Sequence, residues 1–321
     1  MPLSINTNHA AVRASRNLAE NNKLLTKSMQ RLASGKRIID TSDDAGGLAV
    51  AMKLNSSIEK LKGVSSNIKN AISFLDVQDG ILQGAAGILE RMSELKSLSQ
   101  DVLKNSSDIN TYNTEFKNLQ VQLYQMSKEK FNGISLFATT TTASGGTNAV
   151  YGSNNSSTDN TITIFTTENG TSGPKVSVHK TVLLSAITFD ENRVSISKAF
   201  GAASTKSLAV SISGNAKTLT DFTTSFFTQA IENVASLRAQ NGGSMSRLDF
   251  AMSNLDRTRA NLEASYGQIM DVDIAEESTR LAKYQILVQA SASMLAQANM
   301  MPNSAMMLLG YGSSGDSAHY W

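Results

Sequence analysis

The chain has 321 residues but no cysteine, only three prolines, one tryptophan and three histidines. The lack of cysteine excludes disulfides and thiol catalysis, and it leaves both the cytosol and the cell exterior open as locations. No apolar run approaches the length of a membrane-spanning helix. The balance of 29 basic and 27 acidic residues, a net charge of +2, points neither to nucleic acid nor to an anionic membrane as a partner. Residues 1–8 are polar, so we expect no export by an ordinary signal peptide.

Residue patterns that carry catalysis are also missing. The sequence contains no His-Glu-x-x-His pair, no nucleophile elbow around a serine and no glycine-rich phosphate loop. The best acidic cluster is Asp271, Asp273, Glu276 and Glu277, but Ala275 occupies a position that a calcium loop needs for a ligand. These acids suit the first turn of a helix, where the helix dipole favours negative charge. We therefore expect no enzyme, no cofactor and no metal site.

Two distant segments share a helical repeat of 3.5 residues. Apolar or small residues alternate at steps of four and three from Leu54 to Leu89 and again from Leu248 to Ile269. Such a period keeps one stripe of a helix facing a partner helix. We expect the two segments to pair with each other as long packed helices. Most seam positions are large and apolar, so this pair could be stable within one chain.

The ends of the chain repeat the pattern with smaller side chains. Two helices are predicted, over about residues 8–35 and 271–300. Their seam positions at seven-residue spacing are Ala11, Leu18, Leu25, Leu32, Ile274, Leu281, Val288 and Leu295. Alanine, serine and asparagine occupy many neighbouring seam positions, so isolated helices of this kind are marginal. We infer that the termini become ordered mainly when neighbouring subunits supply apolar surface, and that these eight residues form a polymerisation seam.

Several further helix boundaries can be predicted. Ser42 is a candidate N-cap for a long helix that runs to about residue 103, with Asp43 and Asp44 in its first turn. A shorter helix is expected over about 113–128. Helix resumes near Phe222 and continues to about Met270, with a break expected at residues 241–243, where two glycines occur.

The middle of the chain has the period of β-strands. Alternating segments with β-branched residues predict strands at 161–164, 175–178, 193–196 and 208–212. Asn169-Gly170 is a hairpin signal between the first two. Loop-like Ser, Thr, Gly and Asn dominate 139–158, which we regard as a candidate for O-linked glycans. We therefore expect a β-rich domain over about 138–221.

Taken in order, the motifs at both ends resemble those of bacterial flagellin, the subunit of the flagellar filament. The matching segments are residues 4–8, 31–38, Asp43-Asp44-Ala45-Gly46-Gly47-Leu48-Ala49, 131–133, 271–277, 285–287 and Leu295-Ala296-Gln297-Ala298-Asn299. They cover roughly the first 137 and the last 95 residues. Flagellins usually end at a position equivalent to Gly310, so residues 311–321 are an addition of unknown role.

The resemblance implies a mainly α fold with an inserted β domain. A long antiparallel helical coiled coil would be built from both termini, and a β-rich central domain would project outward. The implied domains are 1–42, the N-terminal helix of the inner coiled coil; 43–137, the N-terminal part of the helical core; 138–221, the variable outer domain; 222–270, the C-terminal part of the helical core; and 271–321, the C-terminal helix of the inner coiled coil with the added tail.

The resemblance also implies function and partners. The chain would be a secreted, extracellular structural subunit that polymerises into the flagellar filament for motility. It would meet the flagellar export apparatus, a flagellin chaperone and the filament cap and junction proteins. In many flagellins the stretch equivalent to 89–95 contacts a vertebrate Toll-like innate receptor, and Arg91, Glu94 and Leu95 match that motif. Ser93 departs from it. The alternative is a hook–filament junction protein, and copy number per cell would distinguish the two.

Overall fold

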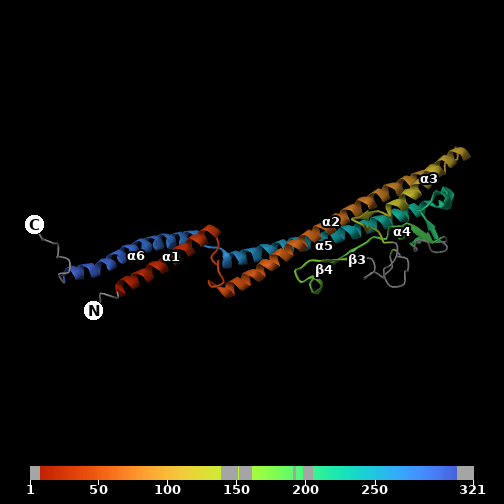
Figure 1. The fold of residues 1–321 in the computed structure, drawn as a ribbon. Coiled ribbons are helices and arrows are strands. Elements are labelled where there is room, and N and C mark those ends of the chain that lie inside the picture. The colour runs from red at the N-terminus through yellow and green to blue at the C-terminus, as the bar shows by residue number, and fades with distance from the viewer. Residues whose placement is uncertain (1–7, 139–150, 152–160, 191–192, 198–204, 309–321) are drawn as a thin grey trace, which may run out of the picture. The chain divides into compact units, whose positions relative to one another are not determined.

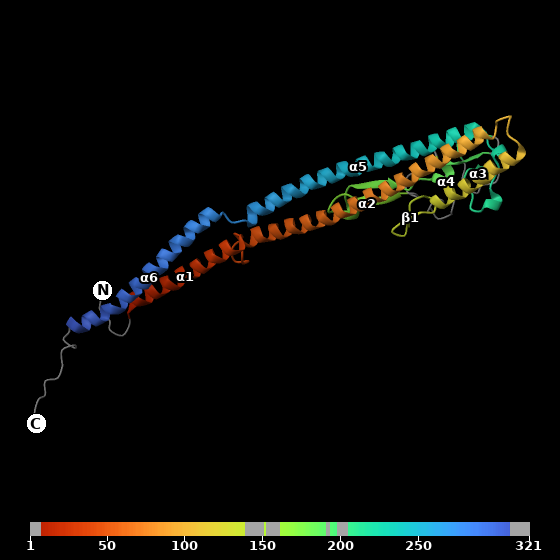
Figure 2. The same ribbon diagram turned by 90° about the horizontal axis from the view of Figure 1, so that it is seen from above.

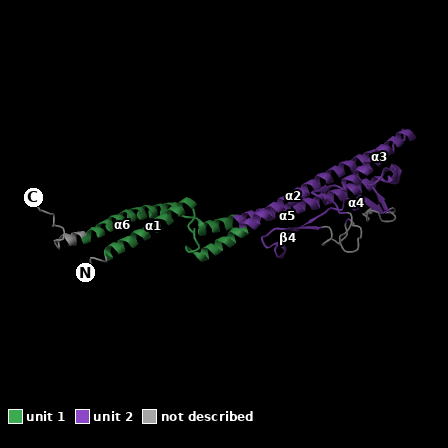
Figure 3. Ribbon diagram, viewed as in Figure 1, with its two compact units in different colours: residues 1–57, 260–321 green, residues 58–259 purple. Residues whose placement is uncertain are grey.

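A computed structural model describes residues 8–138, 151, 161–190, 193–197 and 205–308. The chain divides into two compact units (Figure 3): residues 1–57 with 260–321, and residues 58–259. Both divisions fall inside long helices, α2 (Ala45–Leu98) and α5 (Thr224–Met270). The sequence instead predicted boundaries at 42/43, in the segment between α1 and α2, and at 270/271, at the end of α5; these boundaries stay a prediction.

The first unit contains helix α1 (His9–Ser34) and helix α6 (Ile274–Leu308), which lie side by side in both views (Figures 1 and 2). The pair is antiparallel, because Asn8 bonds to Ala298 whereas Ser28 bonds to Glu277. The Asn8 side chain also caps α1 by accepting a hydrogen bond from Ala11 N at 3.1 Å. Gly35 ends the helix in the left-handed conformation, with φ of 69°. The two terminal helices expected from the sequence are thus present.

A short antiparallel bridge holds the ends of these helices together. Arg37 N donates to Met270 O at 2.6 Å, and Val272 N donates to Gly35 O at 3.1 Å. Beside it, Ile38, Ala51 and Met270 form a small buried cluster. Here the structure corrects the predicted cap. Helix α2 begins at Ala45, and Asp44 rather than Ser42 accepts a hydrogen bond, at 2.7 Å from Gly47 N.

The second unit packs α2 and α5 side by side, with α3 (Ser106–Met126) against them (Figures 1 and 2). The seam expected over residues 54–89 is buried along its length: Ile58, Leu61, Ile68, Leu75, Leu82 and Leu89 are each no more than 5% exposed. The paired seam on α5 buries Leu248 and Leu255. A cluster of phenylalanine rings then joins α3 to the start of α5. The ring centroid of Phe116 lies 5.7 Å from that of Phe222 and 6.0 Å from that of Phe227.

Helix α5 runs without interruption through residues 241–243, so the predicted break is wrong. Asn241 is 2% exposed and donates from Nδ2 to Leu75 O of α2 at 2.8 Å. This contact between helices fixes the backbone beside Gly242 and Gly243 and offsets their low helix propensity. Helix α3 likewise starts at Ser106, earlier than predicted, because Asn105 and Asp108 form a capping box.

The β elements are small sheets inside the second unit. Strands β1 (Lys130–Phe131) and β2 (Ile134–Ser135) make a tight hairpin, and β3 (Thr161–Phe165) pairs with β4 (Lys175–His179). Three further strands form a sheet in the order β6-β5-β7: β5 (Thr188–Asp190), β6 (Arg193–Ser197) and β7 (Thr205–Ser207). The short helix α4 (Leu183–Ala186) precedes β5.

Three of the four predicted strands are confirmed, and the hairpin after β3 contains Gly170 with φ of 55°. The strand predicted at 208–212 is wrong, because β7 ends at Ser207. Leu208 and Ala209 are fully buried, and Val210 N donates to Gln120 O of α3 at 3.3 Å. Leu208 N still donates to Ile187 O at 3.1 Å, whereas Val210 is bonded to α3, so strand pairing does not continue through residues 209–212. The glycan candidates at 139–150 and 152–158 and the tail 311–321 lie outside the described residues.

Candidate assembly surfaces

The predicted polymerisation seam lies mainly between α1 and α6 of the same chain. Seven of its eight residues are partly buried there: Ala11, Leu18, Leu25, Leu32, Leu281, Val288 and Leu295. Ile274, at the first turn of α6, is 67% exposed and takes no part in that burial. Half-buried alanine and leucine supply modest apolar stabilisation. The α1/α6 pair is consequently a thin, two-helix structure whose other faces remain open to solvent.

Polar side chains also cross the seam. Asn21 Nδ2 donates to Ser291 Oγ at 2.8 Å, and Asn8 Nδ2 donates to Ala298 O at 2.7 Å. Ser28, which is 2% exposed, donates to Glu277. Polar residues at seam positions specify the register of paired helices at some cost in stability. These contacts therefore define how α1 aligns with α6.

A buried group of charged side chains lies near the bridge that joins the ends of α1 and α6. The Asp43 side chain is 2% exposed and forms ion pairs with Lys27 and, at 3.5 Å, with Arg31. The hydrogen bond from Lys27 and a backbone hydrogen bond from Ile39 lower the pKa of Asp43, against the opposing effect of burial. Glu277 is 4% exposed and lies 3.9 Å from Arg31 and 3.6 Å from Arg280.

This charged group was only partly foreseen. The sequence placed Asp43 and Asp44 together as capping acids, yet only Asp44 has that role. Asp43 instead joins the segment after α1 to the side of α1 itself. The spacing of Lys27 and Arg31, one helical turn apart, was the available signal that two cations share one helix face.

The side of α6 that faces away from α1 carries a second apolar surface. Ile286, Met294 and Met300 are 67%, 65% and 62% exposed, and they recur at eight and six residues. At 100° per residue this spacing puts them within one third of the helix circumference, opposite Leu281, Val288 and Leu295. We call these three residues the outer stripe. Sequence reasoning concentrated on the heptad seam and missed it.

The stretch 89–95 has a divided exposure. Arg91 and Glu94 are exposed, and Arg91 Nη1 lies 2.7 Å from Glu94 Oε2. Arg91 Nε also donates to Glu115 Oε1 of α3 at 2.8 Å. Hydrogen bonds to Glu115 and Glu94 raise the pKa of Arg91 further above its usual range. Leu95 is fully buried. A partner binding this surface would thus meet Arg91, Glu94 and Glu115, while Leu95 belongs to the core.

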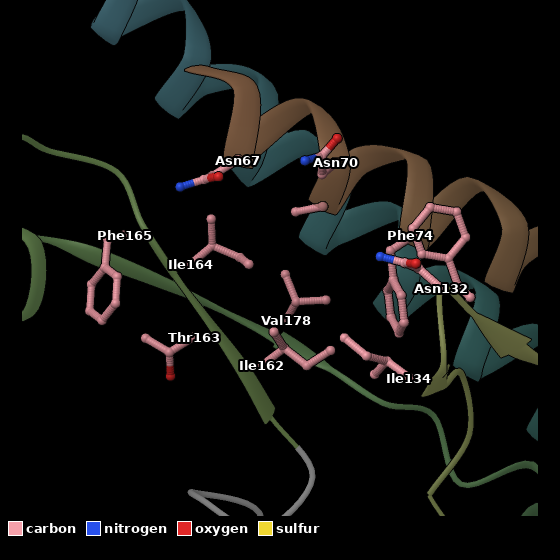
Figure 4. Close-up of a pocket in the computed structure, with 12 residues that line it drawn as sticks. Asn67, Asn70, Phe74, Asn132, Ile134, Ile162, Thr163, Ile164, Phe165 and Val178 are labelled. Atoms are coloured by element: carbon pink, nitrogen blue, oxygen red, sulfur yellow. The ribbon is translucent and has the colours of Figure 1, made fainter. Parts of the chain in front are cut away.

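An apolar pocket of about 470 Å³ lies between α2 and the two hairpins of the second unit (Figure 4). Phe74 and Ala71 of α2 form one wall, and Ile162, Ile164 and Val178 of the β3–β4 hairpin face them. The β1–β2 hairpin closes one end with Phe131 and Ile134. Asn67, Asn70 and Asn132 supply amide groups around the apolar walls. None of the described residues that line the pocket has a titratable side chain.

The described part of the chain offers little for chemistry or membrane insertion. Among its residues, no three His, Cys, Asp or Glu side chains are grouped as a metal site would require. Likewise, none of its helices combines the length and apolarity needed to span a bilayer.

Comparison with known families gives two matches that together cover most of the chain. A model of the bacterial flagellin N-terminal helical region matches residues 5–142, and a model of the bacterial flagellin C-terminal helical region matches residues 224–309. The unmatched segment, 143–223, contains strands β3 to β7.

Individual relatives match nearly the full length. The flagellin of Bacillus subtilis is 30% identical over 323 residues, covering 96% of this chain and 100% of the relative. The flagellin of Listeria monocytogenes is 29% identical over 308 residues, covering 96% and 99%. Among solved structures, the crystal structure of Bacillus cereus flagellin is 20% identical with a TM-score of 0.39, covering 59% of this chain and 88% of that one.

Proposed function

The chain belongs to the bacterial flagellin family and is a structural subunit of the flagellar filament, and from this premise we propose how it assembles. The α1/α6 pair forms within one chain through the seam, and the outer stripe of α6 then packs against neighbouring copies. The hook–filament junction alternative gains no support from the matched relatives, which are flagellins. The filament is external to the cell.

The observation that carries this proposal is the exposure of the outer stripe. Ile286, Met294 and Met300 are each more than 60% exposed on a helix whose opposite side already contacts α1. Three large apolar side chains aligned on one face favour contact with another apolar surface. Because the α1/α6 pair buries little apolar area by itself, we expect it to become fully ordered only in the filament.

Truncation tests the proposal. Purified full-length chain is expected to polymerise, whereas chains lacking residues 1–44 or 271–321 are expected to stay monomeric while the second unit keeps its helices by circular dichroism. Filaments formed by a chain that lacks both ends would overturn the proposal. Hydrogen exchange of the monomer provides a second readout, with fast exchange expected in α1 and α6 and slow exchange in α2 between residues 58 and 98.

We also propose the individual partner proteins that the resemblance to flagellin implies. A flagellin chaperone that holds α6 before export would cover the outer stripe, which explains how an aggregation-prone surface stays soluble in the cell. Export would proceed through the flagellar secretion apparatus, and the cap and junction proteins would contact the same terminal helices. For the outer part, we propose that residues 138–221 form the exposed, β-rich face of the filament.

We propose that a Toll-like receptor contact would involve only the exposed residues of the predicted motif. Arg91 and Glu94 are exposed and bonded to each other and to α3, so they present a charged surface on the monomer. Because Leu95 is buried, its role in such a contact would be to hold α2 in place.

A further inference from the structure

Three asparagines of the second unit are each followed by glycine: Asn132, Asn169 and Asn241. An Asn-Gly pair is prone to deamidation, because the glycine nitrogen is unhindered and can attack the carbonyl carbon of the asparagine side chain. Asparagine counts among the thermolabile residues of proteins. The fold places the three pairs in different environments, and these environments rank their reactivity.

Asn132 and Gly133 form the turn of the β1–β2 hairpin. Phe131 pairs with Ile134 across it, which leaves two residues in the turn. Both have positive φ, 48° for Asn132 and 81° for Gly133, as a type I′ turn requires. The hydrogen bond that closes such a turn joins the flanking residues, so it does not engage Gly133 N. The attacking nitrogen is therefore not held by the turn.

The side chain of Asn132 is accessible as well. Asn132 is exposed and lines the edge of the apolar pocket together with Phe74 and Ile134 (Figure 4). Exposed side chains change rotamer within picoseconds to nanoseconds, so Asn132 Cγ can turn toward Gly133 N without opening the core. Water also reaches this site, and the second step of deamidation consumes water.

Asn241, by contrast, is protected inside helix α5. Its neighbour Gly242 lies in the helix interior, where each backbone N–H is bonded to the carbonyl four residues earlier. Asn241 is 2% exposed, and its Nδ2 donates to Leu75 O of α2 at 2.8 Å. The attacking nitrogen and the leaving group are both engaged, so reaction requires the paired helices to open.

Asn169 is intermediate between these two cases. It is exposed, in the turn between β3 and β4, but its backbone is bonded on both sides. Gly170 N donates to Thr167 O at 3.4 Å, and Asn169 O accepts from Ser172 N at 3.2 Å. The long bond to Thr167 must break before Gly170 N can attack, so we expect slower reaction than at Asn132.

We propose that Asn132 is a self-modification site of the folded chain, where the β1–β2 turn converts to aspartate and isoaspartate. Gly133 N bonds to Asn132 Cγ, the Cγ–Nδ2 bond breaks, and the Gly133 amide proton leaves with that nitrogen as ammonia. The cyclic succinimide then adds a water molecule. Opening at Cγ gives aspartate, whereas opening at the backbone carbonyl carbon gives isoaspartate, whose chain continues through Cγ. Nothing is oxidised or reduced, and water is the co-reactant.

The two products affect the hairpin differently. Isoaspartate adds a methylene to the backbone of a two-residue turn, and the length of the turn sets the register of a hairpin. The hairpin is docked on α2 by Phe131, whose ring centroid lies 6.0 Å from that of Phe74, and by Gln78 Nε2, which donates to Leu136 O at 2.6 Å. Isoaspartate therefore loosens the hairpin from α2. Aspartate tolerates positive φ, so it keeps the turn and adds a negative charge at the pocket edge.

Ageing of the purified, folded chain in mildly alkaline, isotope-labelled water tests the assignment, with peptide mass spectrometry at all three pairs. Asn132 converts fastest and Asn169 next, and Asn241 is slower than Asn132 by about tenfold or more, because its helices must open first. In guanidinium chloride the three rates converge. Conversion of Asn169 or Asn241 as fast as Asn132 in the folded chain overturns the proposal. The same order and spacing of rates in guanidinium also overturns it, since local sequence would then set the ranking.

Asn132→Gly is the matched control, because glycine adopts positive φ and a Gly-Gly turn suits type I′. Labelling by an isoaspartate-specific methyltransferase marks this peptide in the aged parent and leaves it unmarked in the aged variant. Hydrogen exchange over residues 129–138 speeds up in the aged parent and stays unchanged in the aged variant. Equal exchange in the two would overturn the effect on the hairpin. None of these readouts needs polymerisation, so their failure is distinct from failure of the assembly proposal.

Discussion

Asn21 of helix α1 donates a hydrogen bond to Ser291 of helix α6, from Nδ2 to Oγ over 2.8 Å. Both residues sit at seam positions where a stable two-helix pair would carry leucine. Their contact aligns the helices without burying much apolar surface. This compromise agrees with the proposal that the two terminal helices become fully ordered only in the filament.

Replacing both polar residues should therefore stabilise the isolated pair. We expect Asn21→Leu with Ser291→Leu to slow hydrogen exchange of α1 and α6 in the monomer, corresponding to a gain of about 1–3 kcal/mol from two buried leucines. We also expect assembly with altered register, since the polar contact is gone. Unchanged exchange in the double variant would contradict the view that seam polarity limits the monomer's order.

The charges around Asp43 should make the first unit sensitive to acid. Its pKa is lowered in the folded chain, so its contribution is fully present above the ordinary value of 3.8 and is lost as the pH falls through the lower folded value. Asp43→Asn should cost about 1.5–3 kcal/mol at neutral pH, because Lys27 and Arg31 lose a charged hydrogen-bond partner. It should also flatten the loss of stability below pH 4.

Thermal unfolding of the first unit, followed between pH 2 and 7, measures both effects. Asp40→Asn is a suitable control, because Asp40 is exposed and lies outside the ion pairs of Asp43. A parent chain and an Asp43→Asn variant with parallel stability curves across this range would contradict the assignment.

Seam and stripe substitutions should have separable effects. Ile286→Ser removes an outer-stripe residue that is 67% exposed, so the monomer's stability should change by no more than about 0.5 kcal/mol while polymerisation weakens. Leu281→Ser should weaken both the α1/α6 pair and polymerisation. Sedimentation of filaments combined with circular dichroism of monomers distinguishes these cases. If Ile286→Ser assembles like the parent chain, the outer stripe is not part of the interface between subunits.

Methionine oxidation should report the same interface by footprinting. Hydrogen peroxide converts exposed thioethers to sulfoxides. In the monomer, Met294 and Met300 should oxidise quickly, whereas Met92, which is fully buried, should react slowly. In filaments, the two outer-stripe methionines should be protected as well. Peptide mass spectrometry gives the extent at each position, and equal oxidation in monomer and filament would speak against burial of the stripe.

The receptor motif also divides into structural and surface residues. Leu95→Ala should destabilise the second unit by about 2–5 kcal/mol, because it leaves a cavity in a fully buried site. Arg91→Ala should leave unfolding nearly unchanged, since the ion pairs it loses are exposed. Any loss of Toll-like receptor signalling with Arg91→Ala at unchanged stability would assign the contact to the charged surface. Equal signalling by Arg91→Ala and the parent chain would exclude that assignment.

The amino-acid sequence alone determined the helices and their apolar faces. A repeat of 3.5 residues over 54–89 defines one stripe whatever lies against it, and the structure buries that stripe. Strand alternation at 161–164 and 175–178 likewise predicted a hairpin, because neighbouring side chains must point to opposite faces.

Tertiary contacts decided what periodicity leaves open. A seam residue such as Leu25 needs an apolar partner, but only the folded chain pairs it with α6 of the same molecule and leaves Ile286 facing outward. Asn241 keeps α5 continuous through its hydrogen bond to α2, although two glycines follow it. Asp43 is paired with Lys27 across a turn rather than capping a helix. Local sequence sets the propensity of each segment, whereas these outcomes depend on groups that only long-range packing brings within bonding distance.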